Sequence, residues 1–204
     1  MRTCISGFFS LVTACLAIQA FATTAPVTEA APAAIVKFLG LFDQLRAAQA
    51  QAAHGNRQPV SFRVSEVEIN EYMQYSLHAR PRPGVELMTI KIFPYNYIST
   101  FTVVDFDAVE RWRPGTIPAL LRPVLNGRKS IWVDFRIRAQ DSRIGFSVEK
   151  ARYQNVWLPA FFVNKAIAIV AARQPEKYDT SKPIPIPFGL RQLWTSNHVL
   201  LGQN

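Results

Sequence analysis

Residues 130–149, with the sequence SIWVDFRIRAQDSRIGFSVE, decide the fold. Apolar residues alternate with mostly charged or polar ones in two runs, 131–138 and 143–149, and a short polar segment separates the runs. A period of two places the apolar set on one face of a strand and the polar set on the other. Two such runs around a short turn predict an antiparallel hairpin that is apolar on one face and wet on the other.

The first 22 residues have the features of a secretory signal peptide. Arg2 is followed by an uncharged, mostly apolar run that ends in Ala20-Phe21-Ala22, the small-x-small pattern of a cleavage site. Two alternatives stay open: an uncleaved membrane anchor, for which the run is at the lower length limit, and a bacterial lipoprotein processed at Cys15. The sequence therefore predicts an exported, periplasmic protein.

Removal of residues 1–22 changes both the cysteine content and the charge. Both cysteines, Cys4 and Cys15, lie in the removed segment, so the exported chain has no disulfide and no thiol chemistry. Loss of Arg2 leaves 22 basic residues against 14 acidic ones, a net charge of +8. In an envelope compartment this charge favours an anionic membrane surface or wall polymer as partner, and not a nucleic acid.

Two helices are expected before the strands. Residues 23–58 comprise a Thr-, Ala- and Pro-rich leader, which is expected to be flexible, and an Ala-rich helix over 33–53. The apolar stripe of this helix predicts that it packs against the domain, and a membrane-surface helix is the alternative. The stripe consists of Ile35, Phe38, Leu39, Phe42 and Leu45. A short strand at 59–64 is followed by a helix that Ser65 caps, because Ser65 and Glu68 have capping-box spacing.

The rest of the chain predicts a single α+β domain over residues 59–204. Strands are expected at 85–93 and 97–106, a crossing segment with at most short helices at 107–127, and a helix from Pro159 to Arg173. An extended Pro-rich run then leads to one last strand at 189–201. This order predicts an antiparallel meander of about five strands with helices on one face.

The order of these elements resembles that of a known family. The sequence VSEVEINEY at 64–72 is similar to the helix "sEsElNayl" of bacterial envelope proteins with tubular lipid-binding (TULIP-like) domains. The hairpins, the Trp157-Leu158-Pro159 entry to an apolar helix and the Pro-rich run fit the same order over about residues 60–201. The resemblance implies a curved antiparallel sheet wrapped around a long helix, with an apolar tube that takes acyl chains. Since the two-domain members are much longer, it also implies a single unit, and it leaves a homodimer open.

The expected lipid site consists of residues on the apolar faces, and core filling is the alternative reading of each of them. These residues are Ile69, Tyr72, Met73, Ile90, Ile92, Phe101, Val103, Ile131, Val133, Phe135, Phe146, Val148, Phe161, Phe162 and Ile169. Cations on the outer hairpin face form either a patch that meets an anionic membrane or a solvated face without a partner. They are Arg128, Lys129, Arg136, Arg138 and Arg143.

Catalytic and metal-binding motifs are lacking in the sequence. The three histidines share no ligand spacing, and there is no nucleophile elbow, phosphate-binding glycine loop or HExxH sequence. The pair Glu66/Glu68 reads as a helix cap, with a catalytic dyad as the alternative, and the pair Asp105/Asp107 reads as solvated, with metal binding as the alternative. Asn70 either orients a ligand head group or ties down neighbouring backbone. The resemblance implies a lipid-binding protein, and the lack of these motifs predicts one that is not an enzyme and has no cofactor. The alternative is an envelope assembly protein whose basic face docks a protein or an anionic polymer.

Overall fold

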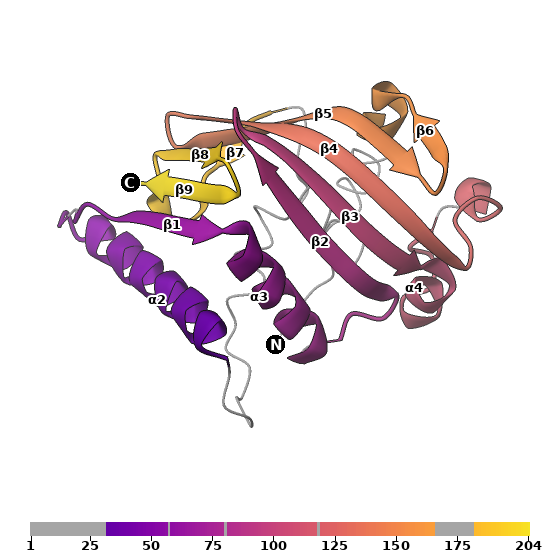
Figure 1. Cartoon of the computed structure of the whole chain (residues 1–204), viewed down its shortest axis with the longest axis horizontal. Coiled ribbons are helices and arrows are strands. Elements are labelled where there is room, and N and C mark those ends of the chain that lie inside the picture. The colour runs from indigo at the N-terminus through magenta and orange to yellow at the C-terminus, as the bar shows by residue number, and fades with distance from the viewer. Residues whose placement is uncertain (1–31, 57, 80, 118, 166–181) are drawn as a thin grey trace.

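The structure is a computed structural model, and it describes residues 32–56, 58–79, 81–117, 119–165 and 182–204. Its largest layer is an antiparallel sheet in the order β2-β3-β4-β5-β6, with β7 paired to β5 (Figure 1). The strands are β2 (Val85–Phe93), β3 (Tyr97–Asp105), β4 (Arg128–Gln140), β5 (Arg143–Tyr153), β6 (Val156–Leu158) and β7 (Ile184–Pro185). The sheet is open, and the predicted α+β class is confirmed.

The central hairpin forms where the alternation predicts it. β4 and β5 pair from Gln140↔Arg143 onward, and the two residues between them, Asp141 and Ser142, both have positive φ (51° and 60°). Two consecutive positive φ values are the geometry of a type I′ turn, whose twist matches that of the strands. The apolar face is buried at Val133, Phe135 and Ile137, so this half of the prediction is confirmed.

A second, smaller sheet joins the two ends of the domain. β1 (Ser61–Ser65) pairs with β9 (Val199–Gln203), which pairs with β8 (Gln192–Ser196). The prediction of one last strand over 189–201 is therefore wrong, because the chain reverses between β8 and β9 at a turn that includes His198 (φ 58°). The predicted short strand near residue 60 is confirmed as β1.

Helix α3 (Glu66–Ala79) covers the otherwise open edge of the large sheet at β2. Asn70 bonds both backbone groups of Ile90: its Oδ1 accepts from the Ile90 N–H at 2.8 Å, and its Nδ2 donates to the Ile90 carbonyl at 2.9 Å. Gln74 donates to the Met88 carbonyl, and the N–H of Ile92 donates to Glu66. Glu66, Asn70 and Gln74 recur every four residues and therefore lie on one face of α3. Their side chains bond the backbone groups of β2, which would otherwise be a template for further strands.

The capping box of α3 is confirmed as well. The Ser65 N–H donates to Glu68 Oε2 at 2.7 Å, and the Glu68 N–H donates to Ser65 Oγ at 3.2 Å. This reciprocal pair satisfies two backbone groups that the first turn leaves without a helical partner.

The remaining helices pack around these two sheets. α2 (Ala33–Ala53) buries its predicted stripe, although Leu39 is only half-buried. α4 (Phe106–Trp112) and the 3₁₀ turn η2 (Ala119–Leu121) form the predicted crossing segment, and η3 (Pro187–Gly189) lies near the C-terminus. The crossing segment packs against the sheet in a second apolar cluster of Val104, Phe106, Val109 and Ile117. Residues 160–165 begin the helix predicted after Pro159, and the remainder of that prediction lies outside the described residues.

Candidate functional site: an apolar cavity behind α2

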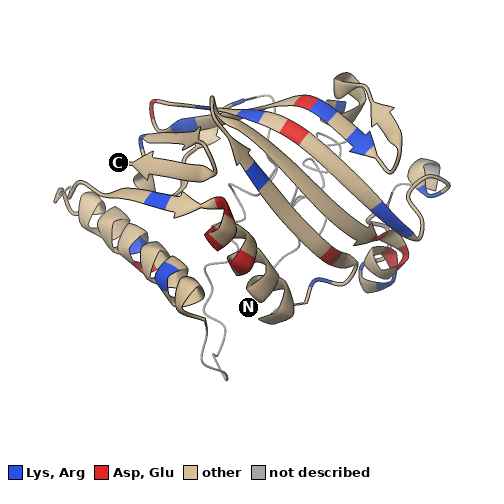
Figure 2. Ribbon diagram, viewed as in Figure 1, with Lys and Arg blue, Asp and Glu red and all other residues tan. Residues whose placement is uncertain are grey.

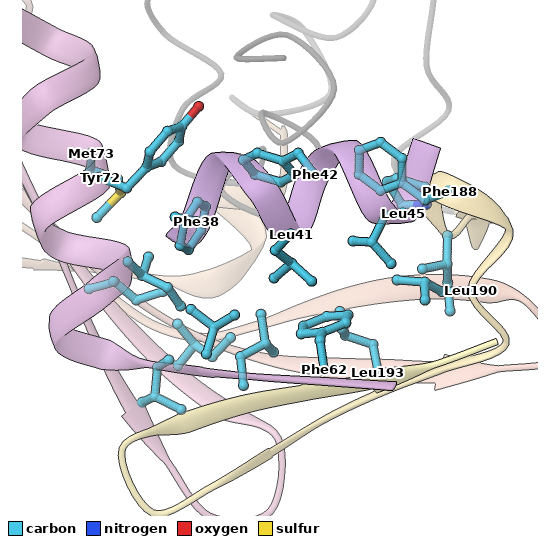
Figure 3. Close-up of a pocket in the computed structure, with 18 of the residues that line it drawn as sticks. Phe38, Leu41, Phe42, Leu45, Phe62, Tyr72, Met73, Phe188, Leu190 and Leu193 are labelled. Carbon is cyan, nitrogen blue, oxygen red and sulfur yellow. The ribbon is translucent and has the colours of Figure 1, made fainter. Parts of the chain in front are cut away.

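An apolar cavity lies between α2, α3, the β2 end of the large sheet and the small sheet. Its volume is about 80 Å³, and its lining side chains are almost all hydrocarbon. Figure 3 shows Leu41 and Leu45 pointing from α2 toward Phe62 and Leu193 on the opposite wall. A cavity of about 150 Å³ is large enough for benzene, and pockets for drug-sized ligands measure about 300–1,000 Å³. The cavity is thus smaller than an acyl chain.

Helix α2 is the wall that closes this cavity, and aromatic contacts hold it in place. The ring of Phe38 stacks on Tyr72 of α3 with a centroid distance of 4.5 Å and an interplanar angle of 18°. Phe42 meets the edge of the same ring at 5.6 Å, and its centroid lies 6.0 Å from that of Phe188 in η3. Such pairs contribute about 0.5–1.5 kcal/mol each beyond their buried area.

One ion pair adds a polar contact between the two helices. Lys37 of α2 binds Glu68 of α3, the residue of the capping box. The hydrogen bond from Lys37 and the backbone N–H of Ser65 lower the pKa of Glu68 to about 2. Because the ends of α2 carry no side-chain cap and no charges that oppose its dipole, α2 depends on these contacts with the rest of the domain.

The predicted lipid-binding residues fall into five groups. Five of them line the cavity: Ile69, Tyr72, Met73, Ile90 and Ile92. A second group fills the large sheet's inner core away from it: Ile131, Val133, Phe135, Phe146 and Val148. Phe161 and Phe162 are 73% and 46% exposed. Ile169 lies outside the described residues.

The last group, Phe101 and Val103, is placed on the wrong face by the prediction. The inner face of β3 carries Ile98, Thr100 and Thr102, which oppose the inward Ile92, Ile90 and Met88 of β2. Phe101 instead lies on the outer face, where its ring is 4.6 Å from that of Trp132. The two threonines mislead because β-branched side chains suit a buried strand despite their hydroxyl groups. The Thr100 hydroxyl donates to the Val133 carbonyl, whereas the buried Thr102 hydroxyl has no partner among the described residues.

Most of the cavity wall comes from residues that the sequence-based site does not include. The clearest omission is the stripe of α2, which the sequence identifies as a buried face without showing what it packs against. The omitted lining residues are Phe38, Leu41, Phe42, Leu45, Phe62, Val64, Met88, Ile98, Ile144, Ile186, Pro187, Phe188, Leu190, Leu193 and Leu200.

The predicted basic residues do not form one patch. Arg128 and Arg138 are ten residues apart on β4, about 33 Å at strand spacing. Arg128 pairs with Glu86, Arg136 bonds both Glu149 and the Tyr95 carbonyl, and Arg143 donates to the Pro183 carbonyl. Figure 2 shows cations and carboxylates interleaved along the sheet.

The polar candidates are structural in this fold. Asn70 bonds the backbone of β2, as the second reading of that residue expects. Asp105, expected to be solvated, caps α4 by accepting from the N–H groups of Asp107 and Ala108. Within the described ranges, no three potential metal ligands lie together, and no helix there has the length and apolarity needed to cross a membrane.

Comparison of the chain with protein-family models, with curated proteins and with solved structures found no match.

Proposed function

We propose that this protein is a non-enzymatic, exported lipid-binding protein, which holds an acyl chain between α2 and the body of the domain. The observation that carries the proposal is the cavity, a void lined by hydrocarbon from both sheets, α2, α3 and the residues around η3. A hydrocarbon lining without a polar anchor suits a ligand recognised through apolar area alone. The TULIP-like order of elements supports the same class of ligand.

The size of the cavity requires α2 to shift when a chain enters. Burial of a methylene stabilises by about 0.8 kcal/mol, so ten methylenes contribute about 8 kcal/mol. Complete exposure of three Leu or Phe side chains of α2 costs about 4.5–9 kcal/mol at about 1.5–3 kcal/mol each, which offsets about half to all of that gain. The expected motion is therefore a displacement that keeps the α2 stripe packed on the bound chain, and not a release of α2.

α2 is the wall that can make this motion. α3 is bonded to β2 through Glu66, Asn70 and Gln74, and these directional contacts fix its position. α2 contacts the body through the aromatic rings of Phe38 and Phe42 and through the pair between Lys37 and Glu68. Apolar contacts are non-directional and tolerate sliding better than paired hydrogen bonds do.

The direct test is lipid recovery and fatty-acid uptake by the purified protein. We expect native mass spectrometry to find co-purified lipid and a fluorescent fatty acid to bind. Leu41→Trp fills the cavity from α2 and should weaken uptake at least tenfold, whereas Val36→Trp, on the exposed side of the same helix, should leave uptake unchanged. Absence of lipid and of uptake from several expression hosts would overturn the proposal, as would equal effects of the two variants.

The small cavity volume favours one alternative, an envelope assembly protein whose interior is filled by its own side chains. This alternative predicts no uptake, an unchanged melting temperature with fatty acid present, and salt-sensitive capture of a protein or anionic polymer. The same uptake assay therefore separates the two functions.

A further inference from the structure

The end of the large sheet at β6 exposes a group of bulky apolar side chains. Val156 and Trp157 of the edge strand are each 62% exposed, and Phe161 and Phe162, in the first turn after Pro159, are 73% and 46% exposed. We call these four residues the β6 patch. Val156 and Trp157 are successive strand residues and point to opposite faces of the sheet, so the exposed apolar side chains lie on both sides of this edge. Exposed side chains of this size are common singly on soluble proteins, and a concentration of them at one edge is typical of an interaction surface.

The charges beside the β6 patch are all positive in the sequence. From residue 150 to residue 165 the chain carries Lys150, Arg152 and Lys165, and it has no Asp or Glu. The central part of the hairpin differs, because there Arg136 is paired with Glu149. Lys150 lies opposite Asp134 in the strand register, so the cations beside the patch are in excess but not free of carboxylates. Apolar and aromatic side chains bordered by an excess of cations are typical of surfaces that lie on anionic membranes.

Arg152 is held in a position that suits an anionic ligand. It lies in one cross-strand row with Trp132 and Trp157, and its guanidinium carbon is 5.3 Å and 5.8 Å from the two ring centroids. Its Nε is buried and has no hydrogen-bond partner among the described residues. Stacking of this kind fixes the guanidinium plane, and a fixed plane can donate two parallel hydrogen bonds to a phosphate.

A groove of about 220 Å³ adjoins this guanidinium. Its lining includes Lys150, Arg152 and Trp157, together with one carboxylate, Asp134. The Tyr97 hydroxyl bonds Asp134, and burial together with this carboxylate raises the pKa of Tyr97 to about 12. Two cations against one carboxylate leave the groove positive, as required for a phosphate-bearing head group.

We propose that the β6 patch docks the protein on an anionic phospholipid bilayer. Trp157, Phe161 and Phe162 enter the interfacial region, where amphipathic and aromatic side chains are stable, and Lys150 and Arg152 meet lipid phosphates. A second copy of the chain is a poorer occupant, because self-pairing would bring the cations of one patch against those of the other. The inference goes beyond the proposed function, since docking requires no ligand in the cavity.

The test is flotation of the protein with residues 1–22 removed on vesicles of phosphatidylcholine alone and of phosphatidylcholine with phosphatidylglycerol at three to one. We expect binding to the anionic vesicles only, with an affinity that falls as salt rises from about 0.05 M to about 0.5 M. The double variant Trp157→Ser/Phe161→Ser should bind at least tenfold more weakly. The control Val67→Ser removes a 63% exposed apolar side chain from α3 and should have no effect.

The cations are tested in the same assay. Each Lys or Arg near an anionic surface contributes about fivefold in affinity, so Lys150→Gln should lose about fivefold and Lys150→Gln/Arg152→Gln about 25-fold. Arg138→Gln, on the outer hairpin face, should stay within twofold of wild type. The Lys150 single variant keeps the test informative if loss of Arg152 disturbs the ring stack, and circular dichroism checks that each variant is folded.

Two results would overturn the inference. One is equal vesicle binding by Trp157→Ser/Phe161→Ser and Val67→Ser. The other is a wild-type dimer in light scattering that becomes monomeric in the double variant, which would make the β6 patch a protein interface. Fatty-acid uptake without vesicles should be unchanged in all these variants, so failure of docking and failure of the cavity proposal are distinguishable.

Discussion

Replacement of Asn70 by Ala tests how the open edge of the large sheet is protected. The substitution removes two hydrogen bonds, one to the N–H and one to the carbonyl of Ile90, at 2.8 and 2.9 Å. Each bond contributes about 1 kcal/mol net, and the two half-buried backbone groups lose their partners, which adds about 1 kcal/mol or more. Alanine returns about 0.5 kcal/mol as the better helix former. We therefore expect a loss of about 2–3 kcal/mol.

Urea denaturation with a matched control measures this loss. Glu71→Ala changes the neighbouring, exposed residue of α3 and should shift the free energy of unfolding by less than about 0.5 kcal/mol. At about 2–4 °C per kcal/mol, the melting temperature of Asn70→Ala should fall by about 5–10 °C. The Ile90 amide should also exchange faster with deuterium, because its bond to Asn70 is gone. The reasoning fails if Asn70→Ala and Glu71→Ala have the same stability, or if Ile90 exchange is unchanged.

Three further predictions concern α2, the turn before β2 and the faces of β3. The pKa of Glu68 is lowered to about 2 in the folded protein, so ionised Glu68 stabilises the fold above about pH 4.5, and this stabilisation is lost as the pH falls from about 4.5 to about 2. The difference in melting temperature between wild type and Lys37→Gln should therefore be present at pH 7 and vanish across this window. A difference that stays constant with pH would contradict this prediction. Gly84→Ala should cost more than about 2 kcal/mol in urea denaturation, because φ is 90° and the added carbon would lie 2.6 Å from a backbone oxygen. Ile98→Ala, on the inner face of β3, should cost about 2–5 kcal/mol of stability and alter fatty-acid uptake. Phe101→Leu, on the outer face, should cost about 1 kcal/mol and leave uptake unchanged. Similar uptake by the two variants would contradict the assignment of the two faces.

The sequence predicts local features of this fold well, because their causes are local. Alternation in the central hairpin requires only that one face be buried, and Val133, Phe135 and Ile137 are buried as expected. The capping box needs two side chains three residues apart, and Ser65 and Glu68 form it. In both cases the partner lies within a few residues or on the adjoining strand.

The predictions fail where a turn lacks its usual sequence signal or where the role of a residue depends on a partner far along the chain. The turn between β8 and β9 contains His198 at positive φ, without the glycine that usually marks a hairpin. Asn70 has a low helix propensity, which singles it out, but only the structure shows that its partner is Ile90. The cavity is the largest omission, because a stripe on α2 indicates a buried face and cannot indicate which elements it closes against.

The two proposed surfaces lie at opposite ends of the longest axis, with α2 at one end and β6 at the other (Figure 1). A molecule docked through the β6 patch would hold α2 away from the bilayer, so an acyl chain could not slide from the docked membrane directly behind α2. Entry behind α2 would then take place on the solvent side, from a second membrane or from a lipid presented by a soluble partner. If both proposals hold, docking fixes the position of the protein and the shift of α2 governs loading. Docking and loading would then be two separate equilibria, because docking through the β6 patch requires no ligand in the cavity.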